Sequence, residues 1–183
     1  MSSQAETIRH NPIGAWLALS FVLWAIVLLI FLPPWVGLAG REIIMSAFRP
    51  LCHQLPDRSP HLSGVQLAVC HRCLGIYVGL AASATVLGAL IAFTRPIEKY
   101  ASFLLPASLV PLAVDWLGDV VGLWTNTPTS RVATGGVFGA VAGVFLARVL
   151  VQAVRQRRSR TIDPGKSDSI VNPVSDSVRD GSA

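Results

Sequence analysis

The sequence has few charged residues. Aspartate, glutamate, lysine and arginine make up 14% of its 183 residues, and hydrophobic residues make up 52%. Because soluble globular proteins carry about 25% charged residues, this shortage indicates that lipid surrounds most of the chain. The sequence also lacks the GxSxG, Walker, HExxH and Rossmann glycine motifs. It therefore shows none of the direct signs of the hydrolases, nucleotide-binding proteins and zinc proteases that such motifs mark.

The charge that is present is mostly positive and unevenly placed. The net charge is +5 at pH 7, but the basic residues do not follow a face studded with aromatic side chains, so we expect no nucleic-acid partner. Much of the positive charge lies between Arg148 and Lys166, just after the last apolar segment. A basic cluster beside a membrane span is typical of contact with anionic lipid headgroups. We therefore expect the residues from Arg155 to Lys166 to meet such headgroups.

Four apolar segments are long enough to cross a bilayer as helices, which takes about 20 residues. They occupy residues 13–32, 74–93, 101–121 and 132–151. The fold class predicted from them is all-α, a polytopic membrane protein with a four-transmembrane-helix bundle over residues 13–154. A loop that contains cysteine and histidine, residues 33–73, joins the first two helices. Within it, Arg41 to Phe48 has apolar residues at helical spacing and is expected to form a helix along the membrane surface.

Polar segments lie at both ends of this domain. We expect residues 1–12 to form an N-terminal tail and residues 155–183 to form a basic and then disordered C-terminal tail. Four spans place both tails on one side of the membrane. Since basic residues favour the cytoplasmic side, we predict a multi-pass protein of the cell membrane with cytoplasmic termini and the Cys/His loop outside. A homo-oligomer is compatible with this arrangement.

Small residues recur at every fourth position in two of the predicted spans. In lipid, where no hydrophobic effect drives helices together, such a face lets helix backbones approach closely. The sequence therefore predicts close helix packing through glycine in a compact bundle. The glycines concerned are Gly75 and Gly79 in the second span, and Gly135, Gly139 and Gly143 in the fourth.

All three cysteines lie in one stretch with most of the histidines. Cys70 and Cys73 form a CxxC pair at the start of the second predicted span, and Cys52 lies upstream. Zinc binds four cysteine or histidine ligands in a tetrahedron, and a CxxC pair commonly supplies two of them. We therefore expect a metal site on the three cysteines and one histidine, with zinc as the leading ion and copper as the second. The histidines that compete for the fourth position are His53, His61 and His71.

The same thiols support redox chemistry. A neighbouring cation such as Arg72 and the start of a helix lower the pKa of thiols in a CxxC pair. In an oxidising compartment Cys70 and Cys73 form a disulfide, which leaves Cys52 as the thiol that exchanges with it. The alternative function is thus a thiol–disulfide or quinone-linked membrane oxidoreductase, although quinone-linked enzymes of this kind need a second cysteine pair. A third interpretation is that the cysteines only staple the loop, through a metal or a disulfide. The leading prediction is a binding protein with no assigned catalytic residue.

Two acidic residues lie inside the third predicted span. Asp115 and Asp119 are four residues apart and share a helix face, and a carboxylate in a membrane is costly unless it is paired, hydrated or protonated. Two interpretations are open: a brace between helices, or a site for a proton, an ion or a headgroup. The second would make the protein a small transporter or lipid-binding module that acts through Asp115. The expected pocket beneath the metal site consists of Arg72, Tyr77, Asp115, Asp119, Asn126 and Arg131.

The runs CHQLPDRS at Cys52–Ser59 and CHRCLGIYVG at Cys70–Gly79 resemble the CHQxPxRS and CxRCxGxYxG signatures of the DUF2085 family of small membrane proteins. The resemblance covers about residues 51–150. It implies the fold and the membrane location but no activity. It also favours His53 as the fourth metal ligand, because the family pattern varies at the position of His71. The later residues of the family pattern are matched in order by Asp115, Asn126, Arg131, Thr134 and Gly135.

Overall fold

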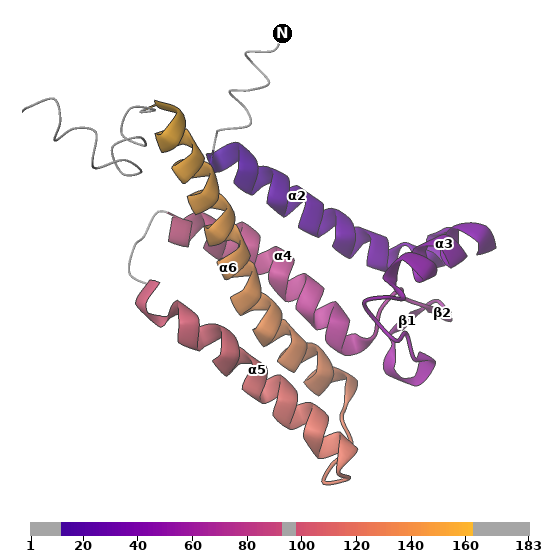
Figure 1. Ribbon diagram of the computed structural model, residues 1–183. Coiled ribbons are helices and arrows are strands. Elements are labelled where there is room, and N and C mark those ends of the chain that lie inside the picture. Colours follow the sequence, from indigo (N-terminus) through magenta and orange to yellow (C-terminus); the bar gives the residue numbers. More distant parts are fainter. Residues whose placement is uncertain (1–11, 93–97, 163–183) are drawn as a thin grey trace, which may run out of the picture.

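The computed structural model describes residues 12–92 and 98–162. In this part of the chain four long helices lie side by side, and a loop with several short elements joins the first of them to the second (Figure 1). In chain order the elements are α2 (Pro12–Phe31), η1 (Pro33–Trp35), α3 (Leu38–Phe48), η2 (Pro56–Arg58), β1 (His61–Leu62), β2 (Val65–Gln66), α4 (His71–Ala92), α5 (Glu98–Val120) and α6 (Pro128–Ile162).

The long helices account for the membrane character of the chain. Among the described residues, three helices are long and apolar enough to cross a membrane, over Ile13–Phe31 in α2, Phe103–Val120 in α5 and Pro128–Val154 in α6. Large apolar side chains such as Phe21 and Phe103 are exposed on their surfaces, as expected of helices that face lipid. The chain is therefore a mostly helical membrane protein.

The predicted count of four spans is not supported. Helix α4 covers the second predicted span, but it is not among the three helices identified by length and composition. It packs against both α2 and α6, and each of its described side chains apart from Val86 is at least partly buried. Ala81 and Ala84 are fully buried. A helix covered in this way meets little lipid, so its sequence favours small packing residues over large apolar ones.

The loop between α2 and α4 contains regular structure. Helix α3 confirms the helix predicted over Arg41 to Phe48. The antiparallel strands β1 and β2 were not predicted. They are joined by a two-residue turn with positive φ at Ser63 (52°) and Gly64 (77°), the backbone conformation that matches the right-handed twist of a hairpin. These strands are too short to give an alternating sequence pattern.

The C-terminal end of the predicted domain differs from the prediction. Helix α6 continues to Ile162, past residue 151 where the predicted span ended, so the first part of the predicted C-terminal tail is helical. The predicted N-terminal tail up to residue 11, the connection at residues 93–97 and the tail after residue 162 lie outside the described residues. The same holds for most side chains of the basic cluster from Arg155 to Lys166.

The largest contact between helices joins α4 to α6, and glycine makes it possible. A Cβ atom on Gly75 would overlap the carbonyl oxygen of Val132, and one on Gly139 would overlap the carbonyl oxygen of Ile76. Because nothing larger than hydrogen fits at these positions, the two backbones are held at a short separation and in one register. The other glycines that face the opposite helix in this way are Gly79, Gly135 and Gly143.

Indole groups attach α2 to the same central helix. The Nε1 of Trp16 donates to the carbonyl oxygen of Ala84 over 2.7 Å, and the Nε1 of Trp24 donates to the hydroxyl of Thr85 over 3.1 Å. Apolar side chains of α2, α4 and α6 fill the space between these helices, and Val27 is one of the buried residues there. In Figure 1 the loop between α2 and α4 lies at the same end of the bundle as the connection from α5 to α6. That end carries the candidate site.

Replacing Gly139 with alanine is expected to destabilise the bundle, because the added methyl group must push α4 away from α6. Overpacking of this kind costs about 1–3 kcal/mol. The matched control is Gly136→Ala, since a Cβ atom there meets only the Gly75 carbonyl oxygen, at 3.8 Å. It should be neutral or stabilising, because alanine favours a helix over glycine by up to about 1 kcal/mol. Unfolding in detergent followed by circular dichroism measures the difference, and equal stabilities would contradict the close contact.

Candidate metal centre

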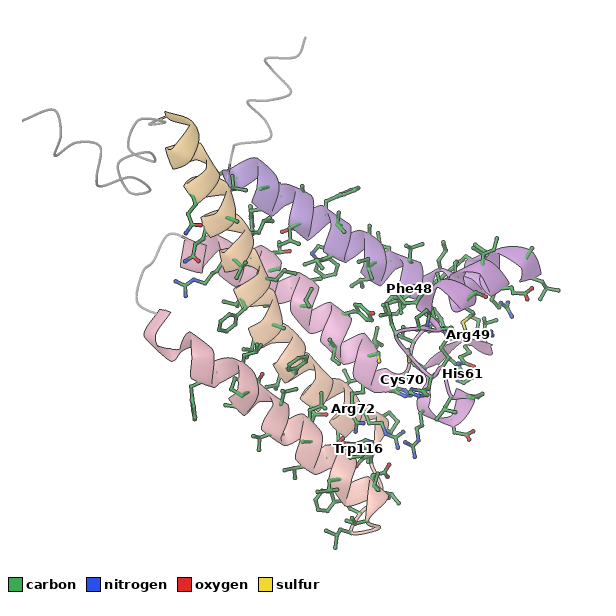
Figure 2. The ribbon with its side chains drawn as sticks, viewed as in Figure 1. Phe48, Arg49, His61, Cys70, Arg72 and Trp116 are labelled. Carbon is green, nitrogen blue, oxygen red and sulfur yellow. The ribbon has the colours of Figure 1, made fainter. Side chains whose placement is uncertain are left out.

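Three cysteines converge where the long loop meets the bundle. The Sγ atoms of Cys52, Cys70 and Cys73 all lie within 4.8 Å of one another, and all three cysteines are free thiols. Figure 2 shows Cys70 at the junction of the loop and the N-terminus of α4. Cys52 and Cys70 are 18 residues apart in the chain, so the fold brings together two separate parts of the predicted site.

Cys52 is positioned by the end of α3. The backbone N–H groups of Leu51 and Cys52 both donate to the carbonyl oxygen of Phe48 over 3.0 Å, which turns the chain back towards the bundle directly after the helix. Cys52 is only 5% exposed and belongs to an apolar cluster that includes Ile30 and Val69. Its thiol is therefore held by packing from α2, α3 and the segment before α4.

Gln54 fixes the loop around Cys52. Its side-chain nitrogen donates to the carbonyl oxygens of Met45 and Ala68, each over 2.8 Å, and its backbone carbonyl accepts a 2.7 Å hydrogen bond from the Gln66 amide. Gln54 has a φ of 53°, a left-handed conformation that costs a residue other than glycine about 1–2 kcal/mol. The hydrogen bonds to α3, to the segment before α4 and to β2 offset this cost. Gln54 is thus a positioning residue for the cysteine site.

Cys70 and Cys73 lie at the start of α4. The N–H of Leu74 donates to the carbonyl oxygen of Cys70 over 2.9 Å, and the Cys70 N–H donates to the Cys52 sulfur over 3.2 Å. Hydrogen bonds from the thiols of Cys52 and Cys73 hold the pKa of the Cys70 thiol far below its usual range. The positive end of the helix also favours the thiolate. Since the thiolate is the form that binds a metal, the Cys70 sulfur is suited to bind a cation.

The histidines are not part of this sulfur group. Nδ1 of His71 is 2.7 Å from the carbonyl oxygen of Arg58, and Nδ1 of His61 is 3.1 Å from that of Ser59, so both rings are held by the loop backbone. His53 is exposed and lies outside the group of three cysteines. It lines the same cavity as they do. The fourth ligand predicted from the sequence is therefore near the sulfur atoms but is not joined to them.

A cavity of about 190 Å³ lies beside the sulfur atoms. Besides the cysteines and His53, its lining includes Trp116 of α5 and an arginine from each of three segments. Figure 2 shows Arg72 and Trp116 close to Cys70 at this end of the bundle. The cavity thus joins the cysteine loop to α4, α5 and α6. The three arginines are Arg58 in η2, Arg72 in α4 and Arg131 in α6.

Asp115 anchors the inner part of the polar network around this cavity. Its carboxylate is buried, and Oδ2 accepts hydrogen bonds from Arg72 Nη2 over 2.5 Å and from Asn126 Nδ2 over 3.0 Å. Asn126 also donates to the Asp115 backbone carbonyl over 2.9 Å. The buried negative charge is therefore paired, as it must be in a low-dielectric environment, and the network links α4, α5 and the turn before α6.

Asp119 lies one turn further along α5 and pairs with two arginines. Its Oδ2 is 3.5 Å from Arg58 Nη2 and 3.8 Å from Arg131 Nη2, and its Oδ1 accepts from the Asn126 N–H over 3.2 Å. Asp119 therefore ties the cysteine loop to both α5 and α6. Of the two interpretations of these acids, the contacts support a brace between the segments that surround the cavity.

The structure and the sequence-based site differ at several residues. Tyr77, predicted in the polar pocket, packs edge to face on Phe48 with ring centroids 6.1 Å apart and is not among the cavity-lining residues. The prediction omitted Gln54, Arg58 and Trp116. Gln54 and Arg58 belong to the run CHQLPDRS, so that motif contained the signal. The sequence provides no signal for Trp116 beyond its position next to Asp115.

Comparison with known proteins agrees with this description. The family described as "Predicted membrane protein (DUF2085)" matches residues 52–145, which is more than half of the chain. The match includes the three cysteines, both aspartates of α5 and the three arginines of the cavity. The chain belongs to the DUF2085 family. The resemblance seen in the two cysteine motifs is therefore confirmed.

This DUF2085 protein is similar to two archaeal proteins. One, named Uncharacterized protein MJ1492, from Methanocaldococcus jannaschii, is 27% identical over 143 residues, which covers 70% of this chain and 87% of that protein. The other, named Uncharacterized protein, from Methanothermobacter thermautotrophicus, is 31% identical over 107 residues, which covers 57% of this chain and 88% of that protein. No solved structure gives a significant match.

In this DUF2085 protein, replacing Gln54 with alanine is expected to expose Cys52, because two side-chain hydrogen bonds that close the loop are lost. At about 1 kcal/mol each, they correspond to a roughly 30-fold larger fraction of open loop. The rate at which a water-soluble maleimide labels Cys52, read by peptide mass spectrometry, should rise accordingly. Gln156→Ala, on an exposed position of α6, is the control. Equal labelling rates in both variants would show that Gln54 does not position the cysteine.

Proposed function

We propose that this integral membrane protein binds one transition-metal ion on Cys52, Cys70 and Cys73, with zinc as the leading ion. The observation that carries the proposal is the convergence of the three sulfur atoms within 4.8 Å. In a tetrahedral zinc site with Zn–S bonds of about 2.3 Å, sulfur atoms lie about 3.8 Å apart. Small side-chain movements therefore suffice to bring the three thiolates to one ion. Copper(I) is the second candidate, because soft thiolate ligands favour it.

His53 is the proposed fourth ligand. It follows Cys52 directly and lines the cavity onto which the three sulfur atoms open. The other two histidines of the loop hold backbone carbonyl groups with their Nδ1 atoms. Because the His53 ring is exposed, it has the freedom to turn towards the ion at little cost in lost packing. A Cys₃His set of this kind is typical of structural zinc sites.

The proposed role is metal binding or scaffolding rather than catalysis. The ligands come from the loop and from α4, and the ion pairs of Asp115 and Asp119 fasten the same segments to α5 and α6. We further propose that α4 crosses the membrane together with α2, α5 and α6. In that arrangement the cysteine loop lies outside the cell and the basic end of α6 lies in the cytoplasm.

Elemental analysis of the detergent-purified protein is expected to show about one equivalent of a transition metal. Cys52→Ser and Cys73→Ser should each remove most of it, because each takes away a thiolate ligand. Ser59→Ala, in the same loop, is the control that should keep the metal. Less than about half an equivalent in the native protein, or a metal content unchanged in both cysteine variants, would refute the metal site.

A pair of histidine variants tests the fourth ligand. His53→Ala should lower the affinity for the metal by more than the roughly 10–100-fold loss that substitutions outside the ligand set produce. His61→Ala should leave the affinity unchanged, because Nδ1 of that ring contacts the Ser59 carbonyl oxygen and His61 is not among the cavity-lining residues. Competition with a chelator of known affinity measures both. If the two variants behave alike, His53 is not a ligand and the fourth position belongs to solvent.

Thiol–disulfide chemistry is the second candidate, and the depressed pKa of the Cys70 thiol favours it. Oxidation of Cys70 and Cys73 to a disulfide removes two electrons and two protons, which a membrane quinone accepts. Intact-protein mass spectrometry after purification without reductant separates the two functions. Three alkylated thiols after metal removal support metal binding. A mass lower by two hydrogens, with Cys52 alone alkylated, supports redox chemistry.

A further inference from the structure

The cavity beside the cysteines has more hydrogen-bond donors than acceptors. Arg58, Arg72 and Arg131 line it, and each guanidinium group carries five N–H donors. The carboxylates of Asp115 and Asp119 pair with these arginines but are not among the lining residues. The acids therefore contact the guanidinium groups from the side away from the cavity. This arrangement leaves other N–H groups of the arginines available to a ligand in the cavity.

Several of these donors are not satisfied by the acids. The Nε of Arg72 is buried and has no hydrogen-bond partner within the described residues. Arg58 and Arg131 lie 3.5 and 3.8 Å from Asp119, which is longer than the roughly 2.7–3.2 Å of an N–H···O hydrogen bond. A buried donor without an acceptor is unfavourable, because it has lost its hydrogen bonds to water. A ligand rich in acceptor oxygens would remove this cost.

The local charge also suits an anion. The three guanidinium groups exceed the two carboxylates by one positive charge. A single thiolate, or a divalent ion on three thiolates, brings this side-chain total to zero, so the remaining positive potential comes from the helix ends. Beyond the side chains, the N-termini of α4 and α6 both border the cavity, and neither first turn contains an acidic residue. Each helix N-terminus contributes roughly half a positive charge, so the cavity has a positive potential.

The size and the opening of the cavity limit the ligand. Its volume of about 190 Å³ is that of roughly six water molecules at about 30 Å³ each, which accommodates a phosphate group with some water. Trp116 is 49% exposed and the Arg58 side chain is 48% exposed, so both lie at the surface. A ligand can therefore enter from the end of the bundle, where water and lipid headgroups meet.

From these observations we propose that Arg58, Arg72 and Arg131 bind a phosphate-class oxyanion in this cavity. The oxyanion is either free inorganic phosphate or the phosphate of an anionic lipid headgroup. The arginines supply the contacts, so this second site goes beyond the metal site and does not depend on an ion being bound to the cysteines.

Calorimetric titration of the full-length protein in detergent tests the proposal in two arms. One arm uses inorganic phosphate, and the other uses a short-chain phosphatidylglycerol below its micelle concentration. At least one of them should bind at one site per chain. Arg58→Gln and Arg131→Gln should each weaken that binding about tenfold or more, because hydrogen bonds to charged groups contribute about 1.5–3 kcal/mol. Arg72 is left intact, since its loss would leave Asp115 buried without its ion pair.

The matched control is Arg49→Gln, because Arg49 is exposed at the end of α3 and does not line the cavity. Binding of phosphate alone supports a free oxyanion, and binding of the lipid alone supports a headgroup. The absence of binding in both arms would overturn the proposal. The proposal would also be overturned if the Arg58→Gln and Arg131→Gln variants bound the ligand as strongly as the Arg49→Gln variant. The metal content of each variant, measured in parallel, separates a failure here from a failure of the cysteine site.

Discussion

The close approach of α4 and α6 is the constraint on which the site depends. Near their N-termini the two backbones are so close that a Cβ atom on Gly135 would overlap the carbonyl oxygen of Arg72. This contact places Arg72 and Arg131 at one cavity and brings two positive helix ends together. Such a concentration of positive charge is unfavourable at the edge of a bilayer unless acids balance it. Asp115 and Asp119 provide that balance from α5, and the positive end of α4 favours a thiolate at Cys70.

The loop between α2 and α4 supplies the remaining groups of the site. A CxxC pair supplies two sulfur ligands, and a third has to come from elsewhere in the chain. The loop supplies Cys52 on a buried turn after α3, and Gln54 holds that turn against the segment before α4. Arg58 of the same loop reaches Asp119. The loop is therefore fastened both at the sulfur atoms and at the acids, and the metal site and the arginine-lined cavity share one wall.

The sequence predicted the parts of this arrangement that depend on composition and short motifs. The apolar runs of α2, α5 and α6 indicated membrane helices because lipid selects for hydrophobic length, and the helix before Cys52 followed from its periodicity. The role of α4 was harder to read, since its apolar length matches that of a membrane span although α2 and α6 cover most of it. The hairpin was missed because two-residue strands leave no pattern. The packing of Tyr77 on Phe48 depends on how the loop folds over α4, which no local signal reveals.

In the proposed site, sulfur atoms from two distant parts of the chain share one metal ion at the end of the bundle where the loop meets α4. X-ray absorption spectroscopy at the metal edge, on the purified full-length protein in detergent, tests it most directly. The account predicts a shell of three sulfur scatterers at about 2.3 Å, completed by one nitrogen or oxygen at about 2.0–2.2 Å. A bound metal with only nitrogen and oxygen around it would contradict the account, and so would two sulfur atoms about 2.05 Å apart in a disulfide with no metal present.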